Sequence, residues 1–313
     1  MSLSPAEMIV DRRQLKRRLW RWRVLAVVLA ILALGSLFWA GGDFNKYSAH
    51  IARVRVDGLI TGDQATLNLL EDIGKSDRVK ALIIRIDSPG GTTAGSEALY
   101  EQIRNVAKVK PVVAVMDTVA ASGGYITAIA TDYIVARGNT ITGSIGVIFS
   151  FPEVSKLLET LGVRMEEIKS GELKAEPSPY KPMSDKVRAV SNEMVQESFF
   201  WFTGLVAERR HLTPERVAVL ADGRVYTGRQ AVAVKLIDAI GGEEVALQWL
   251  ESEKKLSKDL AVVNWANPVN ADPTGLGFSA VNIVLRALGF DGLKQQVESA
   301  RLDGLLVLWH PQF

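Results

Sequence analysis

The chain has 313 residues, of which 48% are hydrophobic and 23% are charged, so we expect one folded domain of catalytic size with appendages. It contains no cysteine, which excludes disulfides, thiolate nucleophiles and cysteine-based zinc or iron–sulfur sites. Its three histidines lie far apart, so we expect no histidine-rich metal site. The net charge of +2 is a local feature, because residues 1–23 carry seven basic and two acidic side chains. The remaining chain is net acidic, and we expect no nucleic-acid partner.

An apolar segment without charge follows the basic one, over residues 24–42. At about 1.5 Å per residue a helix of this length spans roughly 28 Å, close to the hydrocarbon core of a bilayer. The preceding positive charges predict a cytoplasmic N-terminus and an exported remainder, as in a single-pass protein of the cytoplasmic membrane. The alternative is a cleaved signal peptide, for which Ala33-Leu34-Gly35 offers a weak cleavage site.

These patterns predict five regions. They are a cytoplasmic N-terminus (1–23), a transmembrane anchor (24–42), a linker (43–48), a catalytic domain (49–263) and a C-terminal extension (264–313). In the extension we expect a connection, a short apolar helix over Phe278–Leu288, and an apolar end over Leu305–Trp309. We expect both apolar stretches to pack against the catalytic domain or a neighbouring subunit, or else to contact the membrane surface.

Strand and helix patterns alternate through the catalytic region, which predicts an α/β fold with a mostly parallel sheet. The expected strands are His50–Val56, Val79–Ile86, Pro111–Met116, Tyr133–Ala136, Ile145–Phe149 and the alternating stretch Arg164–Lys169. The expected helices are Asp63–Ser76, Thr93–Val109, Ser122–Thr131, Pro152–Leu161, Ser184–Arg210, Thr213–Ala221 and Thr227–Leu236. Val79–Ile86 is nearly all aliphatic, which is typical of a parallel strand buried on both faces.

Two clusters of small residues follow predicted strands, at the sheet edge where open α/β folds place their sites. They are Asp87-Ser88-Pro89-Gly90-Gly91 and Ala120-Ala121-Ser122-Gly123-Gly124-Tyr125. Ser122 stands at a strand-to-helix junction, which suits either a nucleophile or an ordinary helix cap. Because no histidine is well placed to act as its base, a lysine between Lys169 and Tyr180 is the natural substitute. A lysine can accept a proton when burial lowers its pKa.

These motifs together resemble the signal peptide peptidase A family, serine–lysine peptidases with a fold related to Clp protease and the crotonases. The matching pieces also include Thr142-Gly143-Ser144-Ile145-Gly146-Val147, Ser170-Gly171-Glu172-Leu173-Lys174 and the stretch from Tyr226 to Asp238. The resemblance covers roughly Ile51 to Leu250 and fits the short form with a single repeat. It implies a Clp protease/crotonase-like fold of repeated ββα units.

The resemblance also implies the roles of five residues. Ser122 matches the nucleophile, Lys174 the general base and Ser144 a serine that orients the lysine. Gly91 and Gly123 match the two residues whose amides form the oxyanion hole. No metal, nucleotide or organic cofactor is implied.

Family members cleave remnant signal peptides in the membrane, so the resemblance implies hydrophobic peptide substrates, with Gly146–Phe149 as a plausible edge strand to bind them. It also implies a homo-oligomer in which one protomer supplies Ser122 and the next Lys174. Three alternatives stay open: a peptidase specific for one membrane protein of stomatin type, a crotonase-like enzyme acting on acyl thioesters, and an inactive membrane scaffold.

Overall fold

The computed structural model of the chain describes residues 20, 22–24, 26–27, 48–266 and 306–308. It divides into two units, Met1–Ser48 and Ala49–Phe313. The predicted helix Phe278–Leu288 lies outside the described residues, and so do the predicted membrane anchor and linker except for residues 24, 26–27 and 48. Among the described residues, no helix has the length and apolar character needed to span a membrane.

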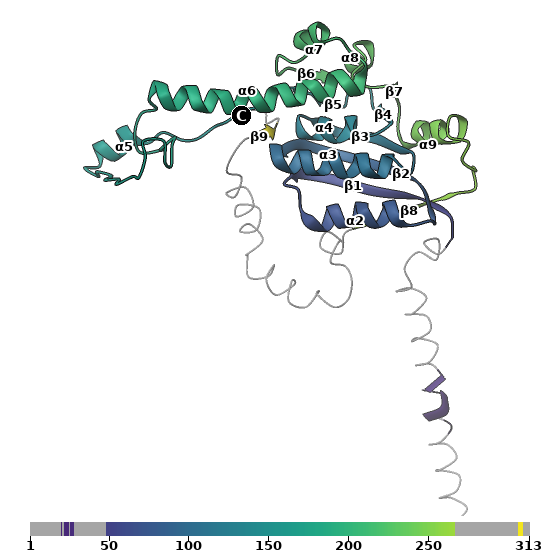
Figure 1. Cartoon of the computed structure of the whole chain (residues 1–313). Helices are drawn as coiled ribbons and strands as arrows, with labels where there is room; N and C mark the ends of the chain where they lie inside the picture. Colours follow the sequence, from purple (N-terminus) through teal and green to yellow (C-terminus); the bar gives the residue numbers. More distant parts are fainter. Residues whose placement is uncertain (1–19, 21, 25, 28–47, 267–305, 309–313) are drawn as a thin grey trace, which may run out of the picture. The chain divides into compact units, whose positions relative to one another are not determined.

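A mostly parallel sheet forms the centre of the second unit (Figure 1). Six strands follow each other in the order β6-β5-β3-β2-β1-β8, while β4 and β9 also pair with β3 and β2, and β7 with β4. All pairs are parallel except β5 with β6 and β2 with β9. The strands in the described part of the chain are β1 (His50–Ile60), β2 (Val79–Thr92), β3 (Val112–Ala121), β4 (Tyr133–Ala136), β5 (Ile141–Gly143), β6 (Val225–Thr227), β7 (Ala239–Ile240), β8 (Ala261–Asn264) and β9 (Leu306–Leu308).

Helices cover both faces of the sheet, as the aliphatic composition of β2 predicts. Helices α2 (Gln64–Lys75), α3 (Thr93–Ala107) and α4 (Gly123–Ile129) bury the alternate residues Leu82 and Ile84 of β2 in the larger apolar core. Helix α9 (Glu243–Ser252) packs on the other face, where Ile83 joins a smaller core. The remaining helices are α5 (Ser155–Thr160), α6 (Asp185–Arg210), α7 (Pro214–Leu220) and α8 (Gly228–Ala233). The predicted α/β class is confirmed, and the mostly parallel sheet fits a Clp protease/crotonase-like fold.

Two expected strands are wrong. Ile145–Phe149 is not a strand, because the chain leaves the sheet at Gly143 (φ +81°) and Ser144 (φ +49°), and the strand β5 precedes this turn. Arg164–Lys169 is not a strand either, and Ile168 within it is fully exposed. Alternation alone does not make a strand when no neighbouring strand supplies the hydrogen bonds.

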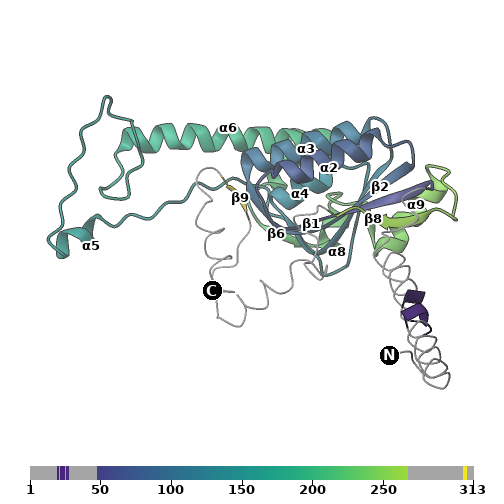
Figure 2. The same cartoon turned by 90° about the horizontal axis from the view of Figure 1, so that it is seen from below.

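Residues 150–184, which we term the arm, project from the sheet beyond the N-terminal end of α6 (Figures 1 and 2). Helix α6 has 26 residues, and its fully buried Phe202 and Val206 lie in its C-terminal half. Within the arm, the Val154 amide donates to the Pro179 carbonyl at 2.8 Å. The arm also exposes a set of large apolar side chains, namely Leu157, Leu161, Val163, Met165, Ile168, Leu173 and Tyr180.

Candidate active site

Ser122 occupies the sharp junction between β3 and α4. Its φ of +54° lies in the left-handed region, which costs a non-glycine residue on the order of 1–3 kcal/mol. Its amide donates to the Gly143 carbonyl at 2.8 Å, and its carbonyl accepts from the Ile126 amide at 2.9 Å. These two hydrogen bonds hold the junction in its strained conformation. Similar strained strand-to-helix turns present the nucleophile in other serine hydrolases.

The Ser122 hydroxyl is buried, with only 1% of the residue exposed, and it has no hydrogen-bond partner among the described residues. Buried polar atoms are nearly always paired, so an unpaired one calls for an explanation such as a catalytic role. An ordinary helix cap would accept a hydrogen bond from the first turn of the helix, but Ser122 makes no such side-chain bond. The geometry therefore favours the nucleophile over the helix cap.

Ser144 lies close to Ser122 through the pairing of β5 with β3. Ala121 is opposite Gly143 in this pair, and Ser144 follows directly. The Ser144 amide donates to the Arg224 carbonyl at 2.8 Å, which helps to hold its positive φ. The structure thus brings the two predicted serines to the same edge of the sheet.

Gly91 also lies at this edge, near the end of β2. It is opposite Ile60 of β1, and a Cβ at this position would lie 1.9 Å from the Ile60 carbonyl oxygen. Only glycine allows this close approach of the two backbones. The same stretch of β2 pairs in antiparallel fashion with β9, which places Gly91 opposite Val307.

Gly123 is the first residue of α4, so its amide has no acceptor within the helix. Its neighbour Gly124 lies against β2, because a Cβ there would be 2.6 Å from the Ser88 carbonyl oxygen. The turn that bears the serine and the strand that bears Gly91 are therefore in direct backbone contact. Gly91 and Gly123 thus lie on two backbone segments that meet at the edge bearing Ser122, as the two amide donors of an oxyanion hole would.

Lys174 is not brought to this edge. It lies in the arm, in the turn between α5 and α6, and its side chain is exposed. Figures 1 and 2 both show that the arm lies away from the sheet and from α4. Within one chain, therefore, the predicted nucleophile and the predicted base are apart.

The other lysines of this stretch are engaged by carboxylates. Lys169 forms ion pairs with Glu167 at 2.9 Å and with Glu176 at 2.8 Å, and Lys181 pairs with the same two carboxylates. Lys186 pairs with Glu172 at 2.5 Å. The hydrogen bond to Glu176, followed by the one to Glu167, raises the pKa of Lys169. Among the four lysines from 169 to 186, Lys174 is the one without an ion pair in the described part of the chain.

Two polar residues near the end of β2, to which the sequence assigned no role, make hydrogen bonds to the neighbouring strands. The Asp87 carboxylate accepts from the Val119 amide at 3.0 Å. The Ser88 hydroxyl donates to the Gly58 carbonyl at 2.6 Å. Their sequence signal is a pair of polar residues at the end of an otherwise aliphatic strand.

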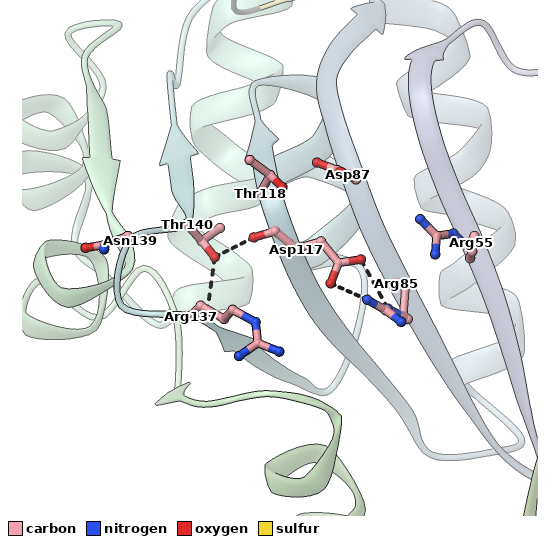
Figure 3. A pocket seen from close by; sticks show the side chains of 8 residues that line it. All are labelled: Arg55, Arg85, Asp87, Asp117, Thr118, Arg137, Asn139 and Thr140. Carbon is pink, nitrogen blue, oxygen red and sulfur yellow. Dashed lines mark hydrogen bonds and ion pairs between the residues drawn. The ribbon is translucent and has the colours of Figure 1, made fainter.

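A separate cleft of about 470 Å³ lies on the face of the sheet that α9 partly covers (Figure 3). Arg85 and Asp117 form an ion pair at 2.6 Å within it. Its lining residues are Arg55, Arg85, Asp87, Asp117, Thr118, Arg137, Asn139 and Thr140. The cleft contains none of the five predicted site residues, so we place the active site at the edge that bears Ser122.

A buried serine at a strained strand-to-helix turn, without a hydrogen-bond partner among the described residues and near close-packed glycines in a mostly parallel sheet, is typical of a serine hydrolase. Comparison with known proteins identifies which family of serine hydrolases this chain resembles. The model of peptidase family S49 matches residues 104–257, a range that includes Ser122, Ser144 and Lys174.

Three relatives agree with this match. A protein of Methanocaldococcus jannaschii, provisionally named a protease, is 38% identical over 191 residues, which are 61% of this chain and 61% of that protein. The chloroplastic serine protease SPPA of Arabidopsis thaliana is 34% identical over 278 residues, 85% of this chain and 40% of that protein. A protein of Enterococcus faecium, provisionally named signal peptide peptidase SppA, is 38% identical over 252 residues, 76% of this chain and 71% of that protein.

The chain therefore belongs to peptidase family S49 and is a serine peptidase. This confirms the resemblance to the signal peptide peptidase A family, and it favours a serine peptidase over the crotonase-like acyl-thioester enzyme. The aligned stretches leave parts of all three relatives unmatched.

Proposed function

We propose that this chain is a membrane-anchored serine endopeptidase that cleaves remnant signal peptides, with Ser122 as nucleophile and Lys174 as general base. The observation that carries the proposal is the buried Ser122 hydroxyl, which has no partner in the described part of the chain. The provisional name of the Enterococcus faecium relative supports the choice of substrate. The apolar run over residues 24–42 supports the anchor, with the N-terminus in the cytoplasm and the peptidase domain outside it.

In the proposed reaction the neutral amine of Lys174 takes the proton of the Ser122 hydroxyl while the oxygen attacks a peptide carbonyl. The resulting oxyanion accepts hydrogen bonds from the Gly91 and Gly123 amides, each worth on the order of 3 kcal/mol in the transition state. Collapse breaks the peptide C–N bond, and the Lys174 ammonium returns the proton to the leaving amine. Lys174 then takes a proton from water as the water oxygen attacks the acyl-enzyme, and it returns this proton to the Ser122 oxygen as the ester C–O bond breaks, which releases the carboxylic acid product and the free serine.

We further propose that Lys174 acts on Ser122 of a neighbouring copy. Three features support this arrangement: the separation of the two residues within one chain, the exposure of Lys174, and the exposed apolar side chains of the arm. A second copy that covers the arm would bury its apolar residues and remove water from around the lysine. Such desolvation favours the neutral amine that a base requires. A head-to-tail contact of this kind closes into a ring when its rotation allows.

An extended apolar peptide can bind to this site by adding a strand to β2. The antiparallel pairing of β9 with Gly90–Thr92 supports this, because it shows that this edge of β2 accepts an added strand, which a substrate would form in place of β9. The segment Gly146–Phe149, which the sequence suggested as the edge strand for the substrate, is not a strand. In our proposal the substrate therefore binds along Gly90–Thr92 instead. A substrate bound here would run beside Gly91 and the Ser122 turn.

The test is cleavage of a panel of synthetic signal peptides by the full-length protein in detergent, with the products identified by mass spectrometry. We expect Ser122→Ala and Lys174→Ala each to abolish cleavage, and we expect Lys174→Arg to be equally inactive because a guanidinium stays protonated. The matched control is Lys186→Ala, which removes an exposed lysine of the same region and should leave the rate unchanged. Cleavage by Ser122→Ala at above about a tenth of the wild-type rate would exclude the proposed nucleophile. If the wild type cleaves a stomatin-type protein but no signal peptide, and Ser122→Ala and Lys174→Ala lose that cleavage, the peptidase specific for one membrane protein replaces signal-peptide clearance.

A further inference from the structure

The backbone of β2 is irregular where it approaches the active site. In the pairing of β1 with β2, Asp57 is opposite Asp87, but Leu59 is opposite Gly90. Strand β1 therefore advances by two residues where β2 advances by three, which is the register of a β-bulge around Ser88 and Pro89. A bulge leaves backbone groups without partners in the ladder, and it sets the direction in which the strand continues to Gly91.

The Ser88 side chain binds the backbone groups on both sides of this bulge. Its hydroxyl donates to the Gly58 carbonyl at 2.6 Å and accepts from the Gly90 amide at 3.1 Å. Ser88 is fully buried, so no water is at hand to replace these bonds. Pro89 has no amide to offer, and the single hydroxyl therefore connects β1 to the residue directly before Gly91.

The backbone of Ser88 also contacts the helix that begins after the nucleophile. Its carbonyl oxygen packs on Gly124, where a Cβ would approach to 2.6 Å. Ser88 thus lies between the strand that bears Gly91 and the turn that bears Ser122. A shift of the bulge would change the separation of these two groups.

We infer that Ser88 is a positioning residue for the peptidase reaction, whose hydroxyl fixes the place of the Gly91 amide relative to Ser122. The inference rests on the proposed function, in which Gly91 donates to the oxyanion. The hydroxyl does not touch the substrate. It acts by hydrogen-bonding the Gly58 carbonyl and the Gly90 amide at the bulge. These bonds hold β2 in the register that puts the Gly91 amide beside the attacked carbonyl.

The experiment compares Ser88→Ala with Ser96→Ala in the full-length protein. Ser96 is an equally buried serine, but its hydroxyl donates at 2.9 Å to the carbonyl of Thr92, the N-cap residue of α3 four positions earlier, and so makes a local bond instead of connecting two strands. For each variant the measurements are kcat and KM on a fluorogenic signal-peptide segment, the melting temperature, and the affinity for a peptide boronate. The boronate forms a tetrahedral adduct with the serine and so reports on the oxyanion hole.

We expect Ser88→Ala to lower kcat by about 10- to 100-fold, because a small misplacement of a catalytic donor has effects of this size. The boronate affinity should fall by a similar factor while KM changes by less than about threefold. Ser96→Ala should lower the melting temperature comparably and leave kcat and boronate affinity near the wild-type values. A purely structural role for Ser88 would instead lower the melting temperature and spare both catalytic measurements, and that result would overturn the inference.

If Ser88→Ala does not fold, Ser88→Cys decides, since a thiol keeps the shape but is a weak donor and acceptor. An intermediate loss of kcat supports the inference, whereas wild-type kcat contradicts it. Ser122→Ala, assayed in parallel, distinguishes failure of the proposed function from failure of the positioning role of Ser88. If that variant still cleaves, the proposed function fails; if only Ser122→Ala is inactive and Ser88→Ala equals Ser96→Ala, the positioning role alone fails.

Discussion

Mixing two inactive variants tests whether the active site is shared between copies. From Phe202, which is buried in the core, to Asp185 at the start of α6, the helix rises about 26 Å at 1.5 Å per residue. Lys174 precedes this outer end and lies in the arm, so its side chain does not bridge the gap to Ser122 of the same chain. A Ser122→Ala subunit keeps a working lysine, and a Lys174→Ala subunit keeps a working serine.

In a ring assembled at random from equal amounts of the two variants, an interface is intact only when a Lys174→Ala subunit supplies the serine and a Ser122→Ala subunit supplies the lysine. Each condition holds for half of the positions, so about a quarter of the interfaces are complete. We therefore expect about a quarter of the wild-type cleavage rate from the mixture, and less than about a hundredth from either variant alone.

The assay uses the two variants coexpressed with different affinity tags, purified in tandem in detergent, and supplied with a fluorogenic signal-peptide segment. Recovery of both tags in one complex demonstrates that the subunits have mixed. The control is the double variant carrying both substitutions, mixed with wild type in equal amounts. It should retain about a quarter of the rate if the site is shared, and about a half if each chain holds a complete site. A mixed complex of the two single variants without activity would refute the shared site and place both residues in one chain.

Three further outcomes are expected. Gly124→Ala should lower activity and cost about 1–3 kcal/mol of unfolding free energy in a denaturant titration, because its Cβ meets the Ser88 carbonyl oxygen at 2.6 Å. Gly204→Ala, which has open space around it in α6, is the control and should not destabilise the protein; equal losses would contradict the clash. Hydrogen bonds from Lys169 and then Lys181 lower the pKa of Glu176 to about 2, below the ordinary 4.5. This stabilisation of the arm is therefore present above pH 4.5 and is lost as the pH falls towards 2. Pepsin digestion of the arm should accelerate over that range in wild type but not in Glu176→Gln, and parallel profiles would refute the assignment. Deletion of residues 306–313 should lower KM severalfold at constant kcat if substrates pair where β9 does, whereas an unchanged KM would show that the two do not compete.

The sequence by itself determined the class of the fold and the chemistry of the nucleophile. The aliphatic runs that became β2 and β3 can be recognised without their partners, because burial on both faces of a parallel sheet demands such composition. Strand β1 could be recognised from the alternation of apolar and polar residues over His50–Val56. Ser122 could be found because a serine among small residues after a strand is a local pattern. The lack of cysteine and of a placed histidine narrowed the base to a lysine.

Only the tertiary structure decided which short segments join the sheet. Strands β6 to β9 have two to four residues each, and so few residues carry too little periodicity to be read in isolation. They become strands because a neighbour offers hydrogen bonds. The same physics excluded Arg164–Lys169, whose alternation is clear but which has no neighbouring strand.

The tertiary structure also decided the arrangement of the site. The separation of Lys174 from Ser122 follows from the length and direction of α6, which no local motif encodes. The roles of Asp87 and Ser88 depend on backbone groups of other strands, Val119 in β3 and Gly58 in β1, that lie about 30 residues away in sequence. A local motif can predict which residues belong to an active site, but the contacts between segments distant in sequence determine where those residues lie.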